Sequence, residues 1–197
     1  MFDYSYHMKN LMADISRRCS AFTHIDMSRI LVGVTRSRNN RKHGLQAKLM
    51  PLKSEGGLRL MRAGKNCYYE MPTVMHDGKE ILYVIYFCLP RFQNLSFGAK
   101  MTTIFHELYH INPDFNGDIR RFPGRFFQHS RSEKEYDRVV RELSKEYLKD
   151  PSPGDLTHFL RLSYEQLCRE SEEIGGLKVY VPEPAPFKPR QEMLFEQ

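Results

Sequence analysis

The chain has 197 residues, a length that favours a single domain and allows a hydrophobic core without disulfide or metal staples. Hydrophobic residues make up 41% and charged residues 27%, values close to those of ordinary folded proteins, which excludes a wholly disordered chain. The net charge of +6 suits contact with nucleic acid, acidic lipid or an acidic protein, and an ordinary solvated surface explains it equally well.

The cysteines and the N-terminus indicate where the chain resides. No two cysteines form a CxxC pair, so the sequence predicts reduced thiols rather than a zinc ribbon or a redox motif. Residues 1–16 lack the basic start and long apolar centre of a signal peptide. The longest apolar run, 81–89, is too short to cross a bilayer as a helix. We therefore expect a cytoplasmic protein with no membrane partner.

The first half of the chain reads as one helix followed by strands. Apolar residues at helical spacing predict a helix over 4–18. Residues 29–36 are rich in β-branched side chains and predict a strand, and 45–52 alternates loosely as the second strand of a hairpin. Residues 53–78 contain repeated glycine turns and are expected to be irregular. Residues 80–88 are almost continuously apolar, which predicts a strand buried on both faces.

The second half is mainly helical. Ser96 is the expected N-cap of a helix whose apolar residues form one buried face: Phe97, Met101, Ile104, Phe105 and Leu108. The Asn112-Pro113 pair ends this helix and a structured loop follows over 114–130. Two further amphipathic helices are expected, and after them a short strand and a proline-rich tail: 132–148, 154–173, 177–181 and 182–197.

The expected helix carries the HExxH motif, as His106-Glu107-Leu108-Tyr109-His110. Residues four apart share one face of a helix, so the two imidazoles can point at one tetrahedral metal ion. Glu107 lies one step around the helix and can reach a metal-bound water without acting as a ligand. Zinc lowers the pKa of its water, and Glu107 can accept the proton and pass it to the leaving amine.

The motif alone is only suggestive, because roughly 2–3% of shuffled chains of this composition would contain it. Its context strengthens the zinc interpretation. The motif helix directly follows a buried strand, and both histidines project away from the apolar face of the helix at ~100° per residue. A metal-free pair of surface histidines is the alternative.

The third zinc ligand stays open at this point. The longer HExxHxxGxxH pattern fails because Pro113 and Asn116 occupy its glycine and histidine positions, which excludes the metzincin subclass. His129 is the next histidine, and Glu133, which opens the following helix, is the alternative ligand. Asp137, one turn later, could orient one of the histidines as a carboxylate partner. An acidic residue at a helix start also has a purely structural explanation in the helix dipole.

The segment HELYHINPDFNGDIRRFPGRFFQHSRSEKEYD resembles the phage metallopeptidase family, a zincin-like group. The likeness covers most of the chain after residue 20 and is densest over 96–137. Its most specific parts are HELYHI, GDIRR and HSRSEKEYD. The resemblance implies zinc ligands at His106, His110 and His129, with Glu107 as the general base.

Together these features predict an α+β, zincin-like fold. We expect a small, mostly antiparallel, twisted sheet packed on the active-site helix and followed by C-terminal helices. The chain then divides into an N-terminal helix, the zincin-like domain and an extended proline-rich tail: 1–20, 21–181 and 182–197.

Two classes of function follow. The first is a zinc-dependent metallopeptidase acting on a protein or peptide, with the substrate aligned along an edge strand between residues 29 and 88. The second is a zincin-fold module that binds DNA or a regulatory protein without turnover. The basic segment 36–48 supports contact with phosphates, or is simply a charged hairpin tip. Glu107 argues for the peptidase, because a purely structural zinc site needs no base and usually has four protein ligands.

Other polar residues near the motif have two explanations each. Arg120, Arg121 and Arg125 could bind a substrate carboxylate or an oxyanion, or could pair with Asp114, Asp118 or acidic residues of the next helix. Tyr136 is a candidate hydrogen-bond donor in the transition state, whereas Tyr109, inside the motif, is expected to pack.

Overall fold

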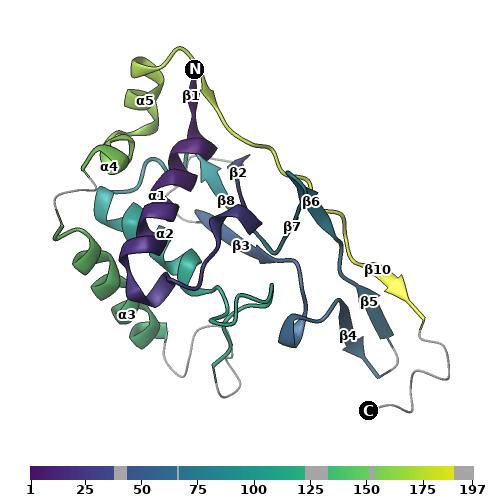
Figure 1. The fold of residues 1–197 in the computed structure, drawn as a ribbon. Coiled ribbons are helices and arrows are strands. Elements are labelled where there is room, and N and C mark those ends of the chain that lie inside the picture. The colour runs from purple at the N-terminus through teal and green to yellow at the C-terminus, as the bar shows by residue number, and fades with distance from the viewer. Residues whose placement is uncertain (38–43, 66, 123–132, 151–153, 189–197) are drawn as a thin grey trace.

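The computed structural model describes residues 1–37, 44–65, 67–122, 133–150 and 154–188. Its centre is a three-stranded sheet of β2 (Ile30–Arg36), β8 (Tyr83–Leu89) and β3 (Ala47–Pro51), in the order β2-β8-β3. Helices lie on one face of this sheet and the C-terminal segment crosses the other (Figure 1). The architecture is α+β, as predicted.

The central strand β8 is buried on both faces, as its continuous apolar composition predicts. Side chains of alternate residues point to opposite faces of a strand, so Tyr83 and Ile85 enter one core and Val84 enters another. The predicted hairpin of β2 and β3 does not form. Both strands pair with β8 instead, β2 parallel to it and β3 antiparallel, because the most apolar strand takes the position covered on every side.

The sheet on the helices therefore contains one parallel and one antiparallel pair, so it is not the mostly antiparallel sheet that was expected. Antiparallel pairing does predominate in the smaller sheets. These are a parallel pair of β1 (Phe2–Asp3) and β9 (Ile174–Gly175), and antiparallel sheets of β4 (Leu60–Gly64), β5 (Cys67–Glu70) and β10 (Ala185–Phe187) and of β6 (Val74–His76) and β7 (Lys79–Ile81).

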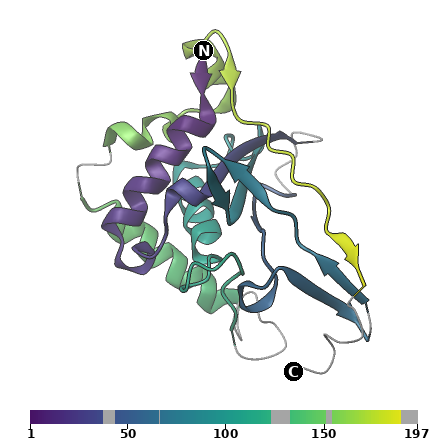
Figure 2. The same cartoon turned by 45° about the vertical axis from the view of Figure 1, so that its right-hand side comes forward.

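The prediction that residues 53–78 are irregular is wrong, since they contain β4, β5 and β6. These strands are short and most of their side chains are exposed, so they show no alternation of apolar and polar residues. The third strand of the sheet that contains β4 and β5 is β10, which comes from the far end of the chain and pairs Phe187 with Tyr68. Figure 2 shows this sheet projecting from the body of the molecule.

The helices follow the predicted pattern with one difference. They are α1 (Tyr4–Arg18), α2 (Phe97–Tyr109), α3 (Glu133–Tyr147), α4 (Gly154–Arg161) and α5 (Tyr164–Glu170), with short 3-10 turns at Ser20–Phe22, Met27–Arg29 and Glu55–Gly57. The single helix expected over 154–173 is split, because Ser163 forms a capping box with Gln166 and starts α5. No helix in the described part of the chain has the length and apolar character needed to cross a membrane.

The main core lies between the helices and the inner face of the sheet. Helix α1 contributes five fully buried side chains to it: Tyr4, Met8, Leu11, Met12 and Ile15. Lys100 of α2 is also buried, and its Nζ donates to the carbonyl oxygens of Leu160 at 2.9 Å and Leu162 at 2.7 Å. The ammonium group thereby ties α2 to the α4–α5 junction, which satisfies a charge that burial would otherwise make costly.

The C-terminal segment covers the outer face of the sheet (Figure 1). The strand expected over 177–181 does not form as a named strand, although Val34 of β2 donates its N–H to the carbonyl of Leu177 at 2.9 Å. Val179 and Val181 pack on a second core of Leu31, Leu52, Ile81 and Val84. The predicted proline-rich tail is extended over 182–188, where it includes β10, and 189–197 lie outside the described residues.

Candidate metal centre

Helix α2 forms the frame of the candidate site. It begins as predicted at Ser96, whose Oγ accepts the N–H of Ala99 at 3.4 Å. Its apolar face is fully buried and points into the main core, through Met101, Ile104, Phe105 and Leu108. This packing fixes the rotation of the helix, so the residues on its other side have a defined direction.

The two motif histidines converge. Nε2 of His106 and Nε2 of His110 are 3.0 Å apart, and the two rings are inclined at 82°. Two nitrogens bound to one tetrahedral zinc at ordinary bond lengths would be about 3.3 Å apart. The imidazole pair is therefore a donor set that fits a single zinc ion, as the four-residue spacing predicts.

Glu107 is buried, with 7% of its surface exposed, and is tied to the sheet. Its Oε2 accepts the backbone N–H of Leu49 at 2.7 Å. Burial raises the pKa of Glu107 to about 7, and the hydrogen bond from Leu49 acts in the opposite direction. Leu49 is part of the site that the motif alone could not reveal, because it lies 58 residues away in sequence.

The backbone of β3 faces the site with one edge. On either side of β3, the carbonyl of Gln46 accepts the N–H of Cys88 at 2.8 Å, and the N–H of Leu52 donates to the carbonyl of Leu82 at 2.9 Å. Alternate residues of a strand face opposite edges, so the backbone groups of Ala47 and Leu49 face away from β8, toward α2. In the described part of the chain β3 is an edge of its sheet.

A cavity of about 340 Å³ lies between this edge and the helices. It is lined by His106 and Glu107 of the motif, by Asp137 of α3, and by Thr102, Thr103 and residues 44–47. The proposed base, one proposed ligand and the exposed strand edge thus share one space. A peptide lying in it would meet all three.

The third ligand is not placed by the structure. His129 lies outside the described residues. Glu133 is the first residue of α3, and its side chain is not described. Within the described residues, no group of three or more His, Cys, Asp or Glu side chains could hold a metal ion. Asp137 forms an ion pair with Arg141 at 3.7 Å. Its role as a partner of a histidine stays a prediction.

Two of the arginines after the motif have structural contacts. Arg120 donates from its backbone N–H to the carbonyl of His110 at 2.6 Å and from Nε to the carbonyl of Tyr109 at 2.9 Å. It thereby caps the C-terminal end of α2. Arg121 pairs with the buried carboxylate of Asp118 through Nε at 2.9 Å and Nη2 at 3.0 Å. Arg125 lies outside the described residues.

Asp118 organises the loop that follows the motif. Besides Arg121, its carboxylate accepts the backbone N–H groups of Gly56 at 3.0 Å and Ile119 at 2.8 Å. The preceding Gly117 has a φ of +91°, which favours glycine, and a Cβ there would lie 2.4 Å from Cγ of Lys53. These residues belong to the GDIRR segment, in which Arg120 contacts the His110 end of α2 while Asp118 and Arg121 fix the loop.

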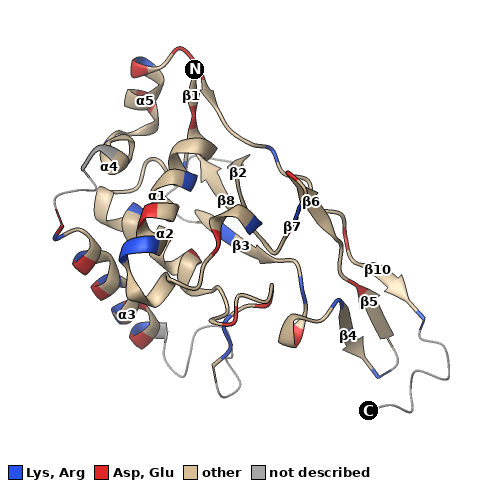
Figure 3. Ribbon diagram, viewed as in Figure 1, with Lys and Arg blue, Asp and Glu red and all other residues tan. Residues whose placement is uncertain are grey.

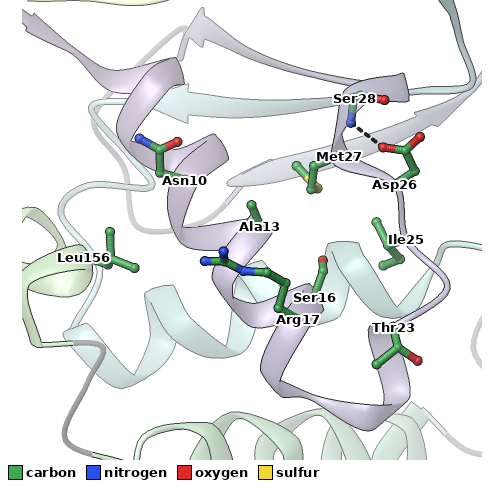
Figure 4. Close-up of a pocket in the computed structure, with 10 residues that line it drawn as sticks. All are labelled: Asn10, Ala13, Ser16, Arg17, Thr23, Ile25, Asp26, Met27, Ser28 and Leu156. Atoms are coloured by element: carbon green, nitrogen blue, oxygen red, sulfur yellow. Dashed lines mark hydrogen bonds between the residues drawn. The ribbon is translucent and has the colours of Figure 1, made fainter.

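A larger cavity, of about 600 Å³, lies elsewhere on the molecule (Figure 4). It is formed between α1, the segment 23–28 and Leu156 of α4. Asp26 on its rim accepts the backbone N–H of Ser28 at 2.8 Å. The motif residues line the smaller cavity, so cavity size alone would have pointed away from the candidate metal centre.

The positive charge of the described residues is spread over several elements (Figure 3). Along α3 the basic residues alternate with acidic ones, and Arg138 pairs with Glu142 at 3.2 Å. Part of the basic segment 36–48 lies outside the described residues. Binding of nucleic acid through that segment stays a prediction.

An α+β fold with an HExxH helix, converging imidazoles and a buried glutamate beside an edge strand defines a metallopeptidase-like class of protein. A family model described as "Putative phage metallopeptidase" matches residues 4–150, and the chain belongs to this family. The predicted resemblance is thereby confirmed. The match includes α1 and ends before α4. Comparison with curated proteins gave no match, and comparison with solved structures gave none.

Proposed function

We propose that this protein is a zinc-dependent metallopeptidase in which His106 and His110 hold the metal and Glu107 is the general base. The observation that carries the proposal is the 3.0 Å approach of the two imidazole Nε2 atoms in α2, with the buried Glu107 next to His106 in the same helix. His106 and Glu107 line one cavity. Membership of the metallopeptidase family supports the same chemistry.

A bound zinc ion would supply a Lewis acid that polarises the scissile carbonyl and makes water more acidic. Catalytic zinc sites usually combine three protein ligands with one open position. His129 is the third ligand in our proposal, and Glu133 is the alternative. Either side chain would bring the number of protein ligands to three.

Glu107 would move the proton. With Oε2 held by the N–H of Leu49, the second carboxylate oxygen can take a proton from water as the water oxygen attacks the carbonyl carbon. The same carboxyl then gives this proton to the nitrogen of the leaving amine when the carbon–nitrogen bond breaks. Burial raises the pKa of Glu107 to about 7, which suits a group that both accepts and returns a proton near neutral pH.

The substrate would lie along β3. The backbone groups of Ala47, which lines the cavity, face away from β8, so an extended peptide can add to this edge as a further strand. Main-chain hydrogen bonds of this kind hold a peptide without reading its sequence. Side-chain selection would then come from the cavity walls, which include Thr102 and Thr103.

The central experiment compares Glu107→Gln with the wild-type chain. We expect the variant to retain about one zinc per chain by elemental mass spectrometry and to lose hydrolysis of a peptide library followed by mass spectrometry. Glu142→Gln, an exposed carboxylate on α3, is the matched control and should keep both. Unchanged turnover in Glu107→Gln would refute the assignment of the base.

The ligands are tested by zinc content. His106→Ala should lose zinc, and either His129→Ala or Glu133→Ala should lose it as well, which identifies the third ligand. A wild-type chain that takes up no zinc after reconstitution would overturn the proposal. Salt-dependent retention of duplex DNA, equal in wild-type and Glu107→Gln chains, would then favour the alternative of a binding or regulatory module.

A further inference from the structure

Tyr136 of α3 forms the wall behind the two motif histidines. Only 2% of its surface is exposed. Its ring centroid lies 4.9 Å from that of His106 and 5.4 Å from that of His110, with interplanar angles of 65° and 33°. A single side chain from a neighbouring helix therefore contacts both imidazoles at once. Tyr109 packs on the same ring at 5.1 Å.

The hydroxyl of Tyr136 has a backbone partner. It donates to the carbonyl oxygen of His106 at 3.2 Å, the same oxygen that accepts the N–H of His110 at 3.3 Å. This contact differs from the sequence expectation of a hydrogen-bond donor for the transition state. It ties α3 to the last turn of α2, at the level of the histidines.

We propose that Tyr136 is a positioning residue of the metal centre, which orders the imidazoles of His106 and His110 before any metal binds. Its ring limits the rotation of both imidazoles, and its hydroxyl adds one hydrogen bond between α3 and α2. Because α3 begins at Glu133, the packing of the Tyr136 ring would also set the distance between the histidine pair and the start of α3, where the alternative third ligand stands in the sequence. The consequence for zinc rests on the proposed function, whereas the ordering of the imidazoles does not.

The physical reason is preorganisation. Side chains that are already ordered lose less conformational freedom when a ligand binds, so ordered imidazoles bind a metal more tightly than mobile ones. Groups that orient metal ligands without touching the metal typically change metal affinity by about 10–100-fold when removed. The Tyr136 ring, which packs against both His106 and His110, is such a group.

The experiment uses the full chain and a matched control on the same helix. Tyr136→Leu removes the ring and the hydroxyl, and Tyr136→Phe removes the hydroxyl alone. Tyr147→Leu is the control, because Tyr147 is also buried in α3 but contacts Phe105 and donates to Asp14. Thermal unfolding confirms that each variant is folded at the temperature of measurement.

The first readout is NMR of the histidine ring protons in metal-free protein at one pH. In the wild-type chain we expect nuclear Overhauser contacts from the Tyr136 ring to both His106 and His110. In Tyr136→Leu the signals of both imidazoles should shift and broaden, and in Tyr147→Leu and Tyr136→Phe they should stay near their wild-type positions. Absence of these contacts in the wild-type chain, or unchanged signals in Tyr136→Leu, would overturn the proposal.

The second readout is the zinc dissociation constant, measured by competition with a chelator, together with the visible spectrum of the cobalt-substituted protein. Tyr136→Leu should weaken zinc binding by about 10-fold or more and alter the cobalt spectrum, whereas Tyr147→Leu should do neither. If zinc binding is weakened equally in Tyr136→Leu and Tyr147→Leu, the loss comes from reduced stability of the fold alone, and the proposal is wrong. If no chain binds zinc, the proposed function fails, and the NMR of the metal-free protein still decides the role of Tyr136.

Discussion

The buried carboxyl of Glu107 makes the stability of the metal-free protein depend on pH. The pKa of Glu107 rises from its ordinary value of 4.5 to about 7 in the folded chain, because burial disfavours the charged form. Between these values the folded protein holds a proton that the unfolded chain has lost. The stabilising contribution of the neutral carboxyl is therefore complete below pH 4.5 and is lost as the pH rises through 7.

The size of the effect follows from the shift. A pKa difference of one unit between the folded and unfolded chain corresponds to about 1.36 kcal/mol. Full ionisation of Glu107 therefore costs the folded state roughly 3 kcal/mol relative to the unfolded one. Glu107→Gln has nearly the same shape and cannot ionise, and its amide oxygen can still accept the N–H of Leu49. We expect the variant to be about 3 kcal/mol more stable than the wild-type chain at pH 8 and nearly equal to it at pH 4.5.

The assay is urea unfolding of both chains at a series of pH values in the presence of a chelator that keeps them metal-free. Other titrating groups are common to the two chains and cancel to first order in the difference. Glu142→Gln, which alters an exposed carboxylate, should differ from wild type by less than about 0.5 kcal/mol at every pH. A stability difference between Glu107→Gln and wild type that does not change with pH would refute the reasoning.

Three further substitutions test the frame of the site by urea or thermal unfolding. Gly117→Ala should destabilise the chain by about 2 kcal/mol, because φ is +91° and the new Cβ would overlap the Lys53 side chain; an unchanged unfolding midpoint would contradict this. Asp118→Ala should cost about 3 kcal/mol by removing the buried carboxylate that accepts from Arg121 and from two backbone N–H groups. A loss below about 1 kcal/mol would show that the loop does not depend on this carboxylate. Gly98→Ala should raise stability by about 0.5 kcal/mol, because a Cβ there meets open space and alanine restricts the unfolded chain. A clear loss of stability would contradict a helical conformation at residue 98.

The parts of the site that the sequence could predict are those fixed by local spacing. The convergence of His106 and His110 depends on one turn of helix, and the direction of that turn depends on an apolar face within the same segment. The N-cap at Ser96 is a local signal as well. Such features need no knowledge of the rest of the chain, so a single sequence is enough to state them.

The parts that could not be predicted depend on contacts between distant segments. Ala185 of β10 pairs with Glu70 of β5, and the composition of neither short strand predicts this pairing. The pairing of β3 with β8 rather than with β2 depends on which strand is buried most completely. The position of Tyr136 behind the histidines depends on how α3 packs on α2, which the helical periodicity of each segment leaves open.

The proposed base combines both kinds of information. Its place next to His106 is local, but its hydrogen bond depends on the register of β3 against β8, in which Leu49 lies opposite Ile85. A slip of one residue would turn the N–H of Leu49 toward β8 and remove the donor from Glu107. The buried side chains of Ala47 and Leu49 on either side of the exposed Lys48 oppose that slip, because it would expose both of them to water. The pattern that packs β3 into the core thus also sets the environment, and with it the pKa, of the carboxylate at the candidate metal centre.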